Sequence, residues 1–476
     1  MKFKRCIFLS ISLFLLSFLS VQVNCIAGNV IIKADSSAWA GKSIAFYHYS
    51  DLITETEELL ARDTANSNGG FRLQFPLDKT TFVFARLGVY MIFLYAEPDK
   101  EYDVIFPSLQ EKSPADMLNP YFEEQFTQLG IKNLPDNDIN VMIRMFNDMY
   151  NPFYNKHVIE VFQGRNFDKL DEDIANIEKS FAGNTNVFFK QYREYRYAYL
   201  RHLAFQHKTK SISEKFFTGK PVLYDNQAYM DLFHQVFDDY FVYHGRTQEG
   251  EKIYTDINTN KDYFALRTTL LKNKLIDNDA LLELVMLKCL YDEFYSDKFS
   301  RSGILAIIDT LAANTVIPES RLIAENIRNK ITNLLSGYPP PAFHLYDADS
   351  NLISLETFKG KYVYLNFCTC SSYTCLKEFE MLNGINQRHK DMLAIVTISA
   401  DPFITSLVEF LKKNNYTWKF LYYANQPGVI KDYDIRAYPT YFLIDPDGKL
   451  VMSPAPAPEE NFETKFFELL KARGEL

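Results

Sequence analysis

The order of hydrophobic and polar residues divides the chain into three successive patterns. Between residues 28 and 110, short runs of β-branched and aromatic residues alternate with turn-forming segments such as 66–70, which is typical of short strands. The expected strands cover residues 29–34, 43–49, 70–75, 81–87, 89–96 and 101–106. Short strands at this spacing predict an N-terminal antiparallel β-sandwich without a catalytic constellation.

A helical pattern replaces the strands from residue 111 to residue 336. Tyr229, Phe233, Phe237 and Tyr240 recur at three- and four-residue intervals, which places aromatic side chains on one face of a helix. We therefore expect a central all-α domain that serves as a spacer, or as a partner-docking or dimerising unit.

Two titratable residues in this region are spaced as metal ligands could be. His234 and Asp238 are one helical turn apart. Because no third ligand accompanies them, they predict a hydrogen-bonded surface pair. No His-Glu-x-x-His motif and no glycine-rich phosphate loop occurs in the sequence, so we expect neither a metal nor a cofactor.

A proline-rich segment at residues 337–341 predicts a stiff linker. After it, the pattern changes to β-α-β-α-β-β-α up to residue 476, which is typical of an α/β domain. The chain is therefore expected to be multidomain, with units at 28–110, 111–336 and 337–476.

The first 27 residues have the pattern of an export signal. A basic start that includes Lys2, Lys4 and Arg5 precedes an apolar run that is shorter than a membrane span. Cleavage after Ala27 is one expectation, and a lipid anchor at Cys25 is the other. We expect a periplasmic or cell-envelope protein with no transmembrane span after signal removal.

The net charge and the cysteine content of the chain limit the kinds of partner that it can have. The 476-residue chain has a formal net charge of −9, which argues against a nucleic-acid partner. In an exported protein, two neighbouring thiols form a disulfide unless a reductant reaches them. Cys289 lies alone in an apolar helical pattern, whereas Cys368, Cys370 and Cys375 fall in one loop.

Several stretches around this loop carry specific motifs. Residues 355–361 read Leu-Glu-Thr-Phe-Lys-Gly-Lys and lead into an apolar strand at 362–367; Tyr438-Pro439-Thr440 precedes another strand and the turn at 445–449. These stretches resemble the TlpA/ResA-like thioredoxin family of exported thiol-disulfide oxidoreductases. The resemblance implies a thioredoxin-like fold and a cis peptide bond before Pro439. It also implies that a partner's extended chain pairs there, against Tyr438, Pro439 and Tyr373.

The centre of the motif departs from the family pattern. Counted from Phe367, the family's Trp-x-x-x-Cys-x-x-Cys places Cys368 at the tryptophan, Ser372 at the first cysteine and Cys375 at the second. The first cysteine is the nucleophile, activated at a helix N-terminus. Serine cannot form a mixed disulfide, so exchange by the usual route is not available.

Three functions remain open from the sequence. In the first, Cys375 pairs with Cys370 or Cys368, as a structural or redox-active bridge, and the protein acts on protein thiols and disulfides. In the second, the domain is inactive and binds an extended peptide or partner protein. In the third, Cys375 performs one-cysteine peroxide chemistry, with Ser372 as the neighbouring hydroxyl and Arg436 as the cation.

Overall fold

The structure, a computed structural model, describes residues 28–162, 169–204, 209–423, 426 and 428–476. The expected signal peptide at 1–27 and the lipid-anchor candidate Cys25 lie outside the described residues. Within the described part of the chain, no helix is both long and apolar enough to cross a membrane.

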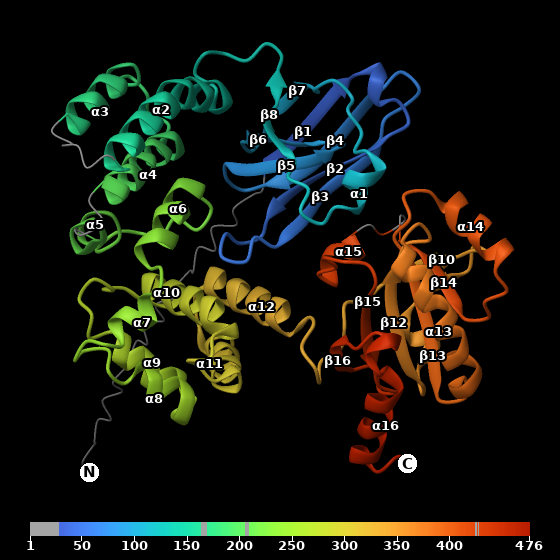
Figure 1. Cartoon of the computed structure of the whole chain (residues 1–476). Coiled ribbons are helices and arrows are strands. Elements are labelled where there is room, and N and C mark those ends of the chain that lie inside the picture. Colours follow the sequence, from blue (N-terminus) through green and yellow to red (C-terminus); the bar gives the residue numbers. More distant parts are fainter. Residues whose placement is uncertain (1–27, 163–168, 205–208, 424–425, 427) are drawn as a thin grey trace, which may run out of the picture.

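The N-terminal region consists of two sheets with an apolar core between them (Figure 1). One sheet has the strand order β4-β1-β7-β9 and the other β3-β2-β5-β6-β8. The elements are β1 (Gly28–Asp35), β2 (Ser43–Tyr49), β3 (Glu57–Thr64), β4 (Gly70–Leu77), β5 (Thr81–Leu87), β6 (Tyr90–Ala96), β7 (Glu101–Ile105), α1 (Pro114–Leu118), β8 (Gln125–Gln128) and β9 (Gly130–Ile131).

The sheets differ from the sequence expectation in two respects. They are mixed rather than antiparallel, since β1 pairs parallel with β7 and β6 pairs parallel with β8. Strand β3 was not predicted, because its sequence Glu-Glu-Leu-Leu-Ala-Arg-Asp-Thr lacks an apolar alternation and none of its side chains is buried. Strands β8 and β9 extend the sheets beyond residue 110, into the stretch that was expected to be helical.

Helices dominate the chain from residue 139 to residue 332. They are α2 (Ile139–Phe162), α3 (Leu170–Lys179), α4 (Val187–Ala204), α5 (Thr209–Phe216), α6 (Gln227–Val236), α7 (Tyr240–His244), α8 (Ile253–Thr255), α9 (Tyr263–Leu270), α10 (Asp279–Asp292), α11 (Arg301–Asn314) and α12 (Pro318–Thr332). Their apolar core includes Phe82, Phe84, Phe93 and Tyr95 of β5 and β6. The helices therefore pack against the outer face of the five-stranded sheet.

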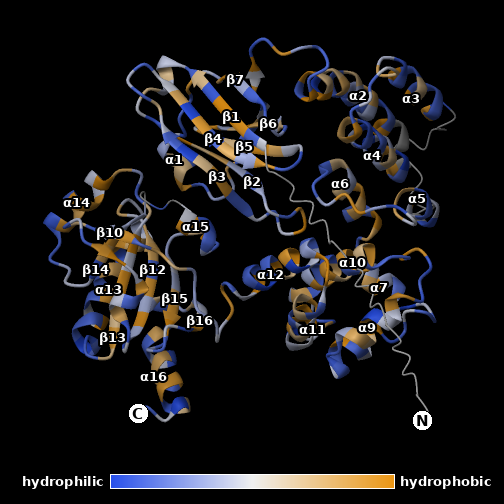
Figure 2. Cartoon of the chain, turned by 180° about the vertical axis from the view of Figure 1, so that it is seen from behind, coloured by the Kyte–Doolittle hydropathy of each residue, from blue (hydrophilic) through white to orange (hydrophobic). Residues whose placement is uncertain are grey.

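The C-terminal region is a seven-stranded sheet with the order β11-β10-β14-β13-β12-β15-β16. Its elements are β10 (Leu345–Asp347), β11 (Leu352–Ile353), β12 (Tyr362–Cys368), α13 (Tyr373–His389), β13 (Leu393–Ser399), α14 (Ile404–Lys413), β14 (Lys419–Tyr422), α15 (Gly428–Asp432), β15 (Thr440–Ile444), β16 (Leu450–Ala455) and α16 (Phe462–Arg473). The central strand β12 pairs parallel with β13 and antiparallel with β15. Apolar residues are concentrated on these strands (Figure 2).

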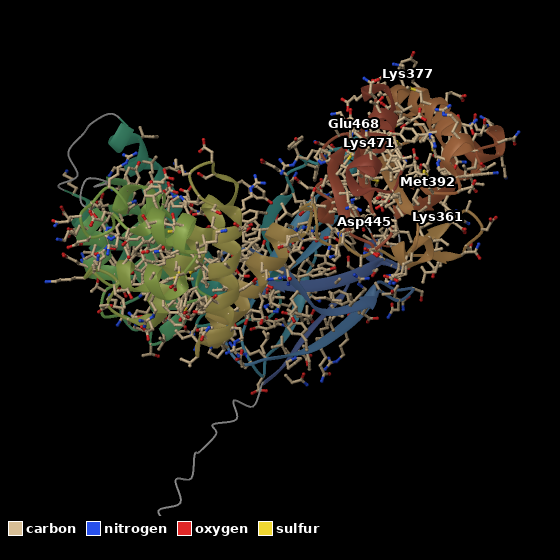
Figure 3. All side chains as sticks on the ribbon, turned by 90° about the horizontal axis from the view of Figure 1, so that it is seen from below. Lys361, Lys377, Met392, Asp445, Glu468 and Lys471 are labelled. Carbon is tan, nitrogen blue, oxygen red and sulfur yellow. The ribbon has the colours of Figure 1, made fainter. Side chains whose placement is uncertain are left out.

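The two faces of this sheet have separate cores. Helices α13, α14 and α16 contribute to the core on one face, and α15 contributes to the core on the other. Lys361 and Asp445 lie at one end of the sheet, whereas Lys377, at the start of α13, lies toward the other end (Figure 3).

A carboxylate of the β-rich region joins the C-terminal region to the rest of the chain. Glu57 on β3 lies 2.6 Å from Lys431 of α15 and 2.8 Å from Arg86 of β5. Asn333, just after α12, donates a hydrogen bond to the backbone oxygen of Asp432. These contacts place α15 beside the β-rich region.

Candidate functional site

The alternation of β12 determines where its last cysteine points. Successive strand residues face opposite sides of a sheet. Tyr362, Tyr364 and Cys368 contribute to the core beneath α13, whereas Val363, Leu365 and Phe367 contribute to the opposite core. Cys368 therefore faces the helix that carries Cys375, and both side chains are buried, with 1% and 0% exposure.

The side chains of Cys368 and Cys375 lie together in the core beneath α13. The contact with the Cys368 thiol is the main cause of a lowered pKa at Cys375. Burial, followed by the contact with Cys375, raises the pKa of Cys368 well above its ordinary value. The pair therefore favours a thiolate on Cys375 and a protonated thiol on Cys368.

Two further contacts lower the pKa of Cys375. The backbone of Thr369 and the side chain of Ser372 lie close enough to the Cys375 sulfur to favour its thiolate. Ser372 is also the N-cap of α13, where its hydroxyl oxygen accepts a hydrogen bond from the Cys375 amide at 3.4 Å. Serine is favoured at an N-cap because it satisfies an amide of the first turn. Ser372 thus has a structural role as the cap of α13.

Cys370 has a different environment from the other two cysteines. Its amide donates hydrogen bonds to both carboxylate oxygens of Asp401, at 3.1 and 3.0 Å. Asp401 follows β13, is buried, and also accepts a 2.6 Å hydrogen bond from Ser399. Burial and the adjacent carboxylate raise the pKa of the Cys370 thiol, which keeps this half-exposed thiol protonated.

The predicted peptide-contact residues lie on both sides of the cysteine loop. The Tyr438–Pro439 bond is cis. Burial raises the pKa of Tyr438, and the charges of Cys375 and Cys368 act in the same direction. Tyr438 is therefore close to the thiol pair. Tyr373, on the first turn of α13, is 82% exposed and is available to a partner.

The sequence interpretation missed a buried acid beside the thiols. Glu378 lies one helical turn after Cys375, and the Tyr441 hydroxyl donates a hydrogen bond to its carboxylate. Burial raises the pKa of Glu378. A signal was present in the sequence, because Glu378 follows Cys375 by three residues and so shares its helix face.

The described residues fit a thiol site and no metal site. No set of three or more histidine, cysteine or acidic residues in the described ranges could hold a metal ion. The four described cysteines, Cys289, Cys368, Cys370 and Cys375, are free thiols in this structure. The chemistry available is therefore that of paired thiols, one of which has a lowered pKa.

Comparison with known proteins finds relatives of the C-terminal region. The family model described as Redoxin matches residues 335–466. The thiol-disulfide oxidoreductase ResA of Bacillus thuringiensis is 34% identical over 117 residues, which cover 24% of this chain and 66% of that protein. ResA of Bacillus subtilis is 27% identical over 174 residues, which cover 36% of this chain and 93% of that protein.

Two solved structures also align with this region. The thioredoxin domain of a thiol-disulfide oxidoreductase from Bacteroides vulgatus is 26% identical, and the alignment covers 28% of this chain and 96% of that one, with a TM-score of 0.26. A thiol:disulfide interchange protein from Bacteroides sp. is 27% identical and covers 29% of this chain and 92% of that one, with a TM-score of 0.27.

The C-terminal region is thus a thioredoxin-fold domain of the thiol-disulfide oxidoreductase type. More particularly, the chain belongs through this domain to the TlpA/ResA-like thioredoxin-fold family. The matched segment spans about 66% of the length of the first of these relatives.

Proposed function

We propose that the C-terminal domain performs thiol–disulfide chemistry with Cys368 and Cys375 as its redox couple. The observation that carries this proposal is the packing of the two cysteine side chains in one buried core, together with the lowered pKa of Cys375. The couple replaces the usual Cys-x-x-Cys, in which the first position is Ser372 here. Cys368 is preferred to Cys370 as the partner because the Cys368 side chain contacts that of Cys375, whereas the Cys370 amide is hydrogen-bonded to Asp401.

The reaction balances with a partner disulfide as the oxidant. The Cys375 thiolate attacks one sulfur of the partner disulfide and releases the partner's first thiolate. The Cys368 thiol then loses its proton to that leaving thiolate and attacks Cys375. The Cys368–Cys375 bond forms, and the partner leaves as one thiol and one thiolate, which takes its proton from water. The reverse sequence reduces the couple at the expense of two partner thiols.

The burial of Cys368 and Cys375 predicts that their thiol–disulfide exchange with a partner is slow. Both sulfurs lie under the first turn of α13, and a partner reaches them only when this turn opens. The slow step is therefore local opening and not thiolate formation. Slow exchange is expected for a disulfide that forms once after export and is reduced only by a specific donor protein.

The location and the partners of the protein are proposed from its sequence. We propose that the protein is exported, that it resides in the periplasm or cell envelope, and that it exchanges with protein thiols or disulfides. Residues 1–27 support export through their basic start and apolar run.

The test is exchange between the full-length chain and oxidised glutathione, followed by counting of free thiols. The wild-type protein is expected to lose two thiols, and Cys375→Ser none. Cys289→Ser is the matched control, because Cys289 is buried in α10, remote from the loop in sequence; it should still lose two. Equal thiol loss in Cys375→Ser and wild type would refute the proposal.

A second candidate is a domain that has lost catalysis and binds an extended peptide or partner protein. It is favoured by the complete burial of both sulfurs and by the 82% exposure of Tyr373. The same assay separates the two functions. If the thiol count of the wild-type protein stays constant in every glutathione buffer, binding is the function that remains.

Peroxide chemistry at Cys375 has less support. Arg436, the candidate cation, pairs with Asp434 at 2.8 Å and with Tyr121 of the β-rich region. Its side chain is 62% exposed, while the Cys375 side chain is fully buried. This function would require consumption of hydrogen peroxide that depends on both Cys375 and Arg436.

A further inference from the structure

A short segment of the C-terminal domain contacts the β-rich region at one end and the thiol site at the other. It runs from Lys431 of α15 to Tyr438, and we name residues 431–438 the strap. Figure 1 shows α15 between the β-rich region and the seven-stranded sheet. The strap is therefore placed to carry an effect of the β-rich region to the cysteines.

Glu57 of β3 holds the first end of the strap. Its carboxylate accepts a hydrogen bond from the Lys431 ammonium at 2.6 Å and two from the Arg86 guanidinium, at 2.9 and 2.8 Å. Burial opposes the ionisation of Glu57, yet its contacts with Lys431 and Arg86 leave its pKa lowered. Glu57 is thus ionised at neutral pH. Because Arg86 binds it in a bidentate manner, the carboxylate is already oriented when it meets Lys431.

Arg436 makes a second contact between the strap and the β-rich region. It lies next to Tyr121, which is 66% exposed and precedes β8. Between the two contact points, Tyr433 and Ile435 are buried in a core of the C-terminal domain. The strap is therefore held by the β-rich region on one side and by the core of its own domain on the other.

The last residue of the strap lies against the thiol couple. Tyr438 is half-buried and packs against the core that includes Cys368 and Cys375. It also packs against the opposite core, which contains Tyr433 and Ile435 of the strap. A shift of the strap therefore shifts Tyr438 relative to the couple. The first turn of α13 opens more easily when Tyr438 can move aside.

We propose that Glu57 is a positioning residue of the thiol site, which holds the strap through Lys431 and so keeps Tyr438 packed against the couple. The β-rich region thereby limits how often the couple is exposed to a partner. This inference rests on the proposed function, because it concerns access to the same two cysteines.

The test is the rate at which iodoacetamide alkylates the couple in the reduced full-length chain, in a Cys370→Ser background. Glu57→Gln removes the charge that holds Lys431. It should speed alkylation about two- to fivefold, as expected for the loss of one partly exposed ion pair. Lys431→Gln should give the same gain. The double variant should gain no more than either single variant, because both changes remove one contact.

Two further variants separate positioning from a merely structural effect. Lys431→Arg keeps the positive charge and should be alkylated at the wild-type rate. Glu58→Gln is the matched control, because this neighbouring carboxylate of β3 lies near His48 and not near the strap. It should also leave the rate unchanged. Lys431 is 71% exposed, so its variants should melt near the wild-type temperature.

The salt dependence gives an independent measurement of the same contact. Added salt screens an exposed ion pair, so it should speed alkylation of the chain that retains Glu57 and Lys431. The rate in Lys431→Gln should not change with salt. A wild-type rate that is independent of salt would overturn the inference.

Unchanged alkylation in Glu57→Gln and Lys431→Gln, or an equal gain in Glu58→Gln, would also overturn it. Iodoacetamide reacts with a thiol whether or not that thiol exchanges with disulfides, so the two proposals fail separately. A wild-type chain that loses no thiols to glutathione refutes the proposed function, while faster alkylation in the two strap variants still supports the restraint by Glu57.

Discussion

Cys375 and Cys370 lie five residues apart, and their surroundings shift their thiol pKa values in opposite directions. Cys375 is fully buried, yet its contacts with Cys368, Thr369 and Ser372 lower its pKa. Cys370 is more exposed, yet burial of its sulfur and the charge of Asp401 raise its pKa. The groups that contact a sulfur, and not its exposure alone, decide which thiol ionises.

The largest expected effect comes from placing a thiol at residue 372, the position that the sequence pattern predicts for a nucleophile. Ser372→Cys puts a thiol at the N-cap of α13, where the helix terminus favours a thiolate, and ahead of Cys375. We expect reduction of insulin by dithiothreitol to be accelerated by about tenfold or more relative to wild type. Ser371→Cys, one residue earlier, is the control and should give no such gain.

The absence of a gain in Ser372→Cys would mean that the loop no longer presents this position to partners. The binding function would then be favoured over a redox function for the whole domain.

Removal of the Cys368 thiol should raise the pKa of Cys375 toward that of Cys370. Cys368→Ala deletes the contact that contributes most to the lowered pKa of Cys375. The midpoint for thiolate formation at Cys375 should therefore move to higher pH. Ultraviolet absorbance of the thiolate, titrated in a Cys370→Ser background, measures this midpoint. An unchanged midpoint would show that the backbone of Thr369 and the Ser372 hydroxyl are sufficient.

Removal of the negative charge beside Cys370 should lower the pKa of Cys370 toward that of Cys375. Asp401→Asn removes a negative charge that raises the pKa of Cys370, so more thiolate is present at neutral pH. We expect alkylation of Cys370 by iodoacetamide to be several-fold faster. Asp434→Asn, at an exposed carboxylate of the same domain, should leave the rate as in wild type. Equal rates in both variants would exclude Asp401 as the cause.

The smallest expected effect is the contribution of Cys370 to the free energy of unfolding at alkaline pH. The folded state keeps Cys370 protonated above the ordinary thiol pKa of 9.0, whereas the unfolded chain releases this proton. The unfolded state then binds fewer protons, so stability falls as pH rises above 9.0. The fall in the urea midpoint should be shallower in Cys370→Ala than in wild type. Parallel pH profiles would contradict the raised pKa.

Much of this domain could be predicted from local sequence. The β12 strand, the α13 helix and the cis bond before Pro439 agree with their expected positions. Apolar runs and turn residues determine these elements locally, and the motif at residues 438–440 determines the peptide bond. The alternation of β12 also predicts the orientation of Cys368, since Tyr362, Tyr364 and Cys368 share the core beneath α13.

The spacing of the cysteines in the sequence could not decide whether Cys368 or Cys370 is the redox partner of Cys375. Asp401 lies 31 residues after Cys370 and reaches it only because β13 pairs in parallel beside β12. Parallel strands joined through a helix bring distant residues to the same sheet end. In the N-terminal region, the exposed strand β3 and the parallel strand β8 escaped prediction for similar reasons, since pairing and not local pattern defines them.

The central claim is that the couple is Cys368–Cys375, and non-reducing peptide mapping tests it most directly. Trypsin leaves all three cysteines on the peptide 362–377, so cleavage after Tyr373 with chymotrypsin is required to separate Cys375 from the other two. In oxidised Cys370→Ser, the two fragments should remain disulfide-linked, and in oxidised Cys368→Ser they should separate. A linked pair in Cys368→Ser that is lost in Cys370→Ser would contradict the account.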